Sequence, residues 1–100
     1  MAKKSVQNVI VRSRDAGVFA GTLISRPSET SVILKDARRL WYWDGAATLS
    51  ELATKGTSNP GACKFPAPVT SIEILGICEI IPLTDDAKKS IDAVAVWSRH

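Results

Sequence analysis

Short runs of β-branched and other apolar residues, separated by turn-forming residues, dominate this 100-residue chain and restrict its fold most strongly. Apolar residues alternate within several of these runs, as in β-strands, whose successive side chains point to opposite faces. Strands are predicted at about residues 6–14, 18–25 and 31–35. Turns are predicted at 15–17, where Gly17 is free to take a positive φ, and at 26–29.

A segment of two arginines and three aromatics follows, and it predicts a further strand at residues 38–43 after a break at Asp36–Ala37. Because side chains alternate along a strand, one face would carry Arg38, Leu40 and Tyr42. The opposite face would carry Arg39, Trp41 and Trp43, which places a guanidinium beside two indole rings. That combination suits stacking on a planar ring and pairing with a phosphate.

The second half of the chain is expected to hold two short helices and a bent strand. Thr48 to Glu51 match a capping box, with Gly56 as the helix stop. Residues 69–83 form a long apolar run, and Gly76 within it indicates a bend. Thr84 is a suitable N-cap for a second helix, followed by a short final strand at 94–97.

These elements predict a mainly β (α+β) fold with one short inserted helix and one C-terminal helix. Gly21 and Gly76 lie inside strand patterns, where glycine indicates bulges or sharp bends. The expected architecture is therefore a small curled antiparallel sheet or a partly open barrel of the SH3/Sm-like kind. We expect one domain at residues 6–100 behind a flexible tail at 1–5.

Composition excludes several classes of site. The sole histidine is the terminal His100, and Cys63 and Cys78 lack the spacing of metal ligands, so we expect no metal, no cofactor and no catalytic triad. Cys78 is interpreted as a small core residue, and Glu79 as a partly buried acid or, more simply, an arginine's partner. The expectation is a protein without enzymatic activity. Without a signal-peptide core or a membrane-length apolar run, we expect a cytoplasmic location.

Charge is unevenly distributed along the chain. Residues 1–43 carry eight Lys and Arg against three acids, whereas residues 44–100 carry five against seven. This asymmetry favours an anionic partner for the first half, with Arg12 and Arg14 on one strand face as further phosphate contacts. An ordinary solvated surface with scattered charge explains the same counts.

Three interpretations of the 38–43 segment remain open on sequence alone. Its tryptophans are core or interface residues beside exposed arginines, or they form a stacking platform with a guanidinium clamp. In the third interpretation the aromatics are hot spots of a protein–protein interface, where Trp, Tyr and Arg are enriched. The choice depends on whether Trp41 and Trp43 face the core, solvent or another subunit.

Two resemblances extend these expectations. Residues 17–23 and 32–37 resemble the strand rhythm of Sm-like, SH3-type barrels, and residues 74–77 resemble the second Sm motif. Leu75 stands where that motif usually carries a basic residue before the glycine. Barrels of this type assemble into rings through edge strands, so the resemblance implies a homo-oligomer.

Residues 35–53, which with Leu34 give the motif LKDARRLWYW and the segment after it, are similar to a family of small proteins of tailed phages and prophages. Cys63–Phe65 and Ile91–Trp97 fit the same family. Small phage proteins of this kind often act by binding, either inhibiting a host defence protein or sequestering a nucleotide signal. The resemblance implies an accessory binding protein of the host cytoplasm.

The resulting hypothesis is a non-enzymatic, oligomeric phage protein that sequesters an anionic, nucleotide-like ligand in an anti-defence role. Trp41 and Trp43 would stack on the base. The expected phosphate contacts are Arg12, Arg14, Arg38 and Arg39. Two alternatives are a single-stranded nucleic-acid-binding, Sm-like protein and a protein-interaction or virion component.

Overall fold

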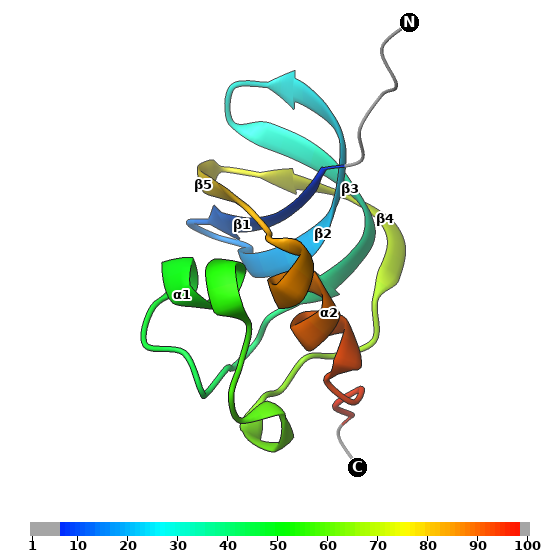
Figure 1. Cartoon of the computed structure of the whole chain (residues 1–100). Helices are drawn as coiled ribbons and strands as arrows, with labels where there is room; N and C mark the ends of the chain where they lie inside the picture. Colours follow the sequence, from blue (N-terminus) through cyan, green and yellow to red (C-terminus); the bar gives the residue numbers. More distant parts are fainter. Residues whose placement is uncertain (1–6, 99–100) are drawn as a thin grey trace, which may run out of the picture.

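The computed structural model describes residues 7–98, so the expected tail at 1–5, the start of the first strand at residue 6 and His100 lie outside the described residues. Five strands form one antiparallel sheet in the order β4-β3-β2-β1-β5. Two helices lie together on one side of this sheet (Figure 1). The elements are β1 (Asn8–Ser13), β2 (Gly17–Ser28), β3 (Ser31–Arg39), α1 (Leu49–Lys55), a 3-10 turn (Pro60–Ala62), β4 (Val69–Leu75), β5 (Ile77–Pro82) and α2 (Asp85–Ala93).

The expected mainly β fold is confirmed in its curled, open form. The sheet does not close into a barrel, since β4 and β5 are its two ends. Gly76 separates these two strands with a φ of +71°, which is the bend expected at this position. The register of β2 against β3 shifts between Ala20 and Thr22, so Gly21 lies at the predicted irregularity, opposite a bulge whose extra residue belongs to β3.

Alternation along the strands divides the core into two parts. Val9, Val11 and Phe19 belong to an inner core built from the sheet's own side chains and lined further by Leu34 and Ile74. The intervening residues face the helices and form a helix-side core. Its buried members are Ile10, Ala20, Leu40, Leu52, Ala53, Cys63, Phe65, Ile91 and Val94. Both faces of the sheet are therefore packed, as the runs of consecutive apolar residues require.

Both helices start where their capping residues predict. The Thr48 hydroxyl accepts a hydrogen bond from the Glu51 amide at 3.1 Å, and the Thr84 hydroxyl accepts one from Ala87 at 3.0 Å. The Glu51 carboxylate reaches the Ala47 amide, one residue earlier than a capping box requires. Gly56 ends α1 as predicted.

Three predictions about strands are wrong. Residues 38–43 are not a separate strand, because β3 runs without interruption through Asp36, which takes a φ of +52°, and ends at Arg39. β2 extends to Ser28, which pairs with Ser31, so the turn lies at 29–30 instead of 26–29. The segment 94–97 forms only one bridge, from Val96 to Phe65.

The prediction that Cys78 is a core residue is also wrong. Cys78 is exposed on β5, whereas Cys63 is buried, and both thiols are free. The pairing of β5 with β1 shifts at this point, from Arg12 opposite Glu79 to Ser13 opposite Ile77, so Cys78 is the extra residue of a bulge. Glu79 is the arginine partner that the sequence suggested, since its carboxylate lies 3.0 Å from the Arg12 side chain.

Candidate ligand-binding surface

The six residues predicted to bind a ligand do not form one group. Arg12 lies on β1 directly opposite Glu79 of β5, and the ion pair between them is solvent-exposed. Arg14 is exposed in the turn between β1 and β2. Arg39 reaches the same turn from β3, because its guanidinium donates to the carbonyl oxygen of Ala16. These three arginines therefore gather near the β1–β2 turn.

Arg39 also covers an aromatic ring at this end of the sheet. Its guanidinium carbon lies 4.3 Å from the centre of the Phe19 ring, a cation–π contact. The two residues line a cleft of about 420 Å³ together with Asp15 and Glu73. The two acids oppose the charge of Arg39, so this cleft offers no concentrated positive potential to an anion.

Arg38 is a structural clamp. It is 7% exposed, and three of its nitrogens donate to backbone carbonyls at 3.0, 2.9 and 3.0 Å, those of Pro66, Ile91 and Phe65. Burial lowers the pKa of the Arg38 guanidinium, and the charge of Asp92 partly offsets this effect. The side chain therefore joins β3 to the 65–66 segment and to the C-terminal end of α2.

Trp41 and Trp43 do not share a face. Trp43 is half-buried and packs on the helix-side core. Trp41 is 59% exposed, and its ring stacks on Trp97 with the ring centres 5.0 Å apart and the planes 9° from parallel. Because the chain leaves the sheet after Arg39, the alternation expected of a strand does not apply here.

Trp41, Tyr42, Trp97 and Lys64 form an aromatic cluster on the surface. The Lys64 ammonium nitrogen lies 5.2 Å from the Trp41 ring centre, 5.6 Å from that of Trp97 and 5.8 Å from that of Tyr42. It is about equally far from the two stacked indoles, so it lies beside the pair and covers neither outer face. The cluster thus combines stacking surface with one positive charge.

Backbone pairing brings these distant residues together. Tyr42 and Lys64 form an antiparallel bridge, in which the Lys64 amide donates to the Tyr42 carbonyl at 2.7 Å. Phe65, fully buried, forms a parallel bridge with Val96, and the Trp97 amide donates to the Phe65 carbonyl at 3.0 Å. The 64–65 segment is thus the centre of the cluster, with the 42 and 96–97 segments on its two sides.

Sequence reasoning missed Lys64 and Trp97 as site residues. Each lies more than twenty residues from Trp41, and neither belongs to a pattern that indicates a common surface. The third tryptophan of the chain was the available signal, since a large ring in a short C-terminal segment needs a packing partner. The partner of this half-buried ring is the exposed Trp41 ring instead of the core.

Residues 7–98 contain no group of three His, Cys, Asp or Glu side chains arranged to hold a metal ion. No helix within the same residues is long and apolar enough to cross a membrane.

A family model described as a domain of unknown function, DUF6948, matches residues 6–91. The chain belongs to this family. No curated protein and no solved structure matches the chain. The DUF6948 match includes Trp41, Tyr42 and Lys64, and ends before Trp97. The family description states no activity, so a functional proposal for this DUF6948 protein depends on its surface geometry.

Proposed function

We propose that this protein is a binding protein whose aromatic cluster takes a planar, anionic ligand of the nucleotide type. One observation carries the proposal: two parallel indole rings, one of them mostly exposed, lie beside the Lys64 ammonium group. A nucleobase stacks on an exposed indole, and a phosphate attached to it pairs with a nearby cation. The cluster offers both groups within one surface.

Stacking supplies enough free energy for such a site to function. Base–aromatic stacking is worth about 1–3 kcal/mol per base. Trp97 supports Trp41 from one side, so the exposed ring is already fixed and loses little entropy when a base stacks on it. The ligand therefore meets a preformed platform.

The size of the cluster favours a mononucleotide or dinucleotide over a long strand. Proteins that bind single-stranded nucleic acid combine several stacking rings with a positively charged groove along the backbone. Here one pair of stacked rings has one lysine beside it, and Arg38 is committed to backbone carbonyls. The other predicted phosphate ligands gather at the β1–β2 turn instead.

The biological role follows as part of the same proposal. The resemblance of residues 35–53 to small phage proteins supports a non-enzymatic accessory protein that sequesters a signalling nucleotide in the host cytoplasm. The sheet ends at β4 and β5, whose outer edges have no partner strand among residues 7–98. Such edges are open to strand pairing, which supports a homo-oligomer.

Tryptophan fluorescence tests the proposal directly. The full-length protein is titrated with AMP, cyclic di-AMP and an oligothymidylate of eight nucleotides. We expect AMP and cyclic di-AMP to quench the tryptophan emission at lower concentration than the oligothymidylate does. Trp41→Ala is expected to weaken binding about tenfold or more, from the stacking energy of one base. Lys64→Gln is expected to weaken binding and to reduce its salt dependence, because it removes one phosphate contact.

Lys55→Gln serves as the matched control, because Lys55 is an exposed lysine at the end of α1, outside the aromatic cluster. Urea unfolding of each variant checks the fold, and Trp41→Ala should lose no more than the roughly 0.5–1.5 kcal/mol of one aromatic pair. Equal binding by Trp41→Ala and the unaltered protein, or no quenching at millimolar nucleotide, would refute the nucleotide site.

A protein-binding role is the second candidate. Tyr42 is 49% exposed and contacts the same Lys64 ammonium group, so ring surface extends beyond the stacked indoles. Exposed Trp and Tyr side chains are frequent hot spots of protein interfaces. In that case the aromatic variants would lose a protein partner while the isolated protein binds no nucleotide.

A further inference from the structure

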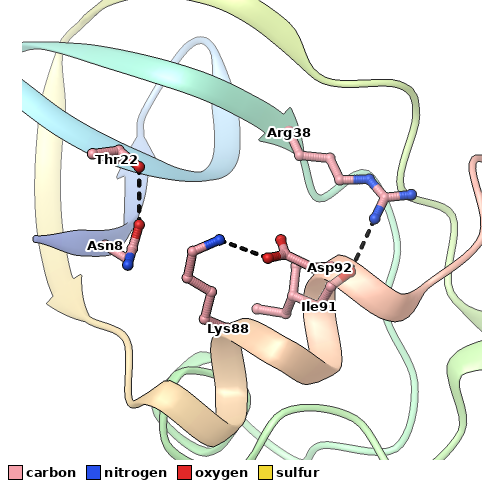
Figure 2. A network of polar contacts seen from close by, with 6 residues as sticks. All are labelled: Asn8, Thr22, Arg38, Lys88, Ile91 and Asp92. Atoms are coloured by element: carbon pink, nitrogen blue, oxygen red, sulfur yellow. Dashed lines mark hydrogen bonds and ion pairs between the residues drawn. The ribbon is translucent and has the colours of Figure 1, made fainter. Parts of the chain in front are cut away.

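A cleft of about 390 Å³ lies between the sheet and α2, apart from the aromatic cluster. Its size is near the lower end of the roughly 300–1,000 Å³ typical of small-molecule sites. Its polar walls are Asn8, Thr22, Asp36, Arg38, Lys88 and Asp92. Figure 2 shows Asn8 and Thr22 on the sheet facing Lys88 and Asp92 on α2, with Arg38 at the far end.

The charges in this cleft are balanced. Arg38 and Lys88 are cations, and Asp36 and Asp92 are anions. A simple anion would meet two carboxylates and a simple cation would meet two basic groups, so neither is favoured overall. A ligand that carries one positive and one negative charge can pair with both the acidic and the basic side chains of the cleft.

The spacing of the two α2 charges restricts the ligand further. Lys88 Nζ and Asp92 Oδ2 lie 2.6 Å apart, so a cation and an anion of the protein are side by side. An α-amino acid carries its ammonium and carboxylate on the same carbon, which matches this close arrangement. The pair is solvent-exposed, with side-chain exposures of 38% and 60%, so a ligand can replace it at a cost of about 0–1 kcal/mol.

On the sheet, Asn8 offers a further hydrogen-bond donor to the carboxylate group of such a ligand. The Thr22 hydroxyl donates to Asn8 Oδ1 at 2.9 Å, which fixes the amide plane and leaves the Asn8 Nδ2 hydrogens for another acceptor. In Figure 2 the Asn8 nitrogen lies on the side away from Thr22, toward α2. Asn8 and Lys88 can therefore donate to one carboxylate from opposite walls.

The rest of the cleft is apolar, which indicates the side chain of the ligand. It is lined by Ala20, Leu83, Ile91, Val94 and Val96. An aliphatic side chain fits these walls, whereas a charged one would be desolvated without a partner. We propose that this cleft binds a free α-amino acid with an aliphatic side chain, held by Lys88 and Asn8 at the carboxylate and by Asp92 at the ammonium group.

Calorimetric titration of the full-length protein with L-leucine, N-acetyl-L-leucine and L-leucinamide tests this proposal. Only L-leucine carries both charges, so it is expected to bind at least tenfold more tightly than either derivative. Lys88→Gln is expected to weaken L-leucine binding at least tenfold. Lys89→Gln is the matched control, because the neighbouring lysine is exposed and does not line the cleft.

Asp92→Asn provides a second, independent variant, expected to lose the preference for L-leucine over N-acetyl-L-leucine. Thermal melts check that each variant is folded. N-acetyl-L-leucine binding as tightly as L-leucine would make the site an anion site and overturn the zwitterion assignment. Unchanged binding in Lys88→Gln, or no heat with L-leucine at millimolar concentration, would also overturn it.

Discussion

Replacing Arg38 by methionine tests whether this arginine holds the fold together or waits for a ligand. Methionine keeps the length and apolar stem of the side chain but removes its hydrogen bonds to the carbonyls of Pro66, Phe65 and Ile91. Hydrogen bonds from a charged donor contribute about 1.5–3 kcal/mol each, and together these would exceed about 4 kcal/mol.

Two effects make the expected loss of stability smaller than this sum. The Phe65 and Ile91 carbonyls each keep a backbone N–H partner, so they are not left without a donor. The variant also no longer buries a guanidinium, whose lowered pKa shows that its charged form is penalised by burial. We therefore expect Arg38→Met to lower the free energy of unfolding by about 3 kcal/mol, a large part of the 5–15 kcal/mol typical of a domain.

Urea unfolding followed by tryptophan fluorescence measures this loss, with the slope m checking that the unfolded state is unchanged. Arg39→Met is the matched control, since the adjacent arginine is exposed and makes one hydrogen bond and one ring contact. Its expected loss is about 1 kcal/mol or less. If the two variants lose the same free energy, the clamp role of Arg38 is wrong.

Two further predictions concern the loop after α1 and the thiols. Gly56→Ala should lower the free energy of unfolding by about 2 kcal/mol or more, as measured by urea unfolding, because φ is +78° and an added Cβ would collide with the Ser90 side chain. Gly61→Ala is the control and should change stability little, because an added Cβ would have no atom within 4 Å. A thiol reagent should label the exposed Cys78 in the native protein and the buried Cys63 only after urea unfolding, and equal native rates would contradict the placement of β5.

Local patterns predicted much of the fold. Alternation predicted the first strand, and the structure places its Val9 and Val11 in the inner core and its Ile10 in the helix-side core. Gly21 and Gly76 indicated the places where the register of β2 and β3 shifts and where the chain bends. Capping residues and bend glycines act within a few residues of the chain, so a sequence reveals them directly. Whether the sheet closes into a barrel depends on whether its edge strands, β4 and β5, pair with each other, and no local sequence pattern determines this pairing.

The 38–43 segment shows where local reasoning fails. The sequence predicts a break at Asp36, but β3 continues through this residue, because β3 pairs with β2 on one side and with β4 on the other both before and after Asp36. Beyond Arg39 the chain instead pairs through Tyr42 with Lys64. That partner lies in a proline-containing loop and gives no strand signal, so the faces of Trp41 and Trp43 could not be predicted.

The clamp and the aromatic cluster share the backbone at Phe65, which affects how binding experiments are interpreted. Arg38 donates to the Phe65 carbonyl, and the Trp97 amide donates to the same oxygen. Loss of the clamp would therefore disturb the position of Trp97 and weaken binding without any contact between Arg38 and the ligand. Trp41 separates the two effects, because its removal takes away stacking surface and leaves the clamp intact. A nucleotide affinity that falls in Trp41→Ala at nearly constant stability would identify the ring as the contact. If nucleotide affinity falls only in variants that also lose stability, as we expect for Arg38→Met, the residue positions the aromatic cluster and does not contact the ligand.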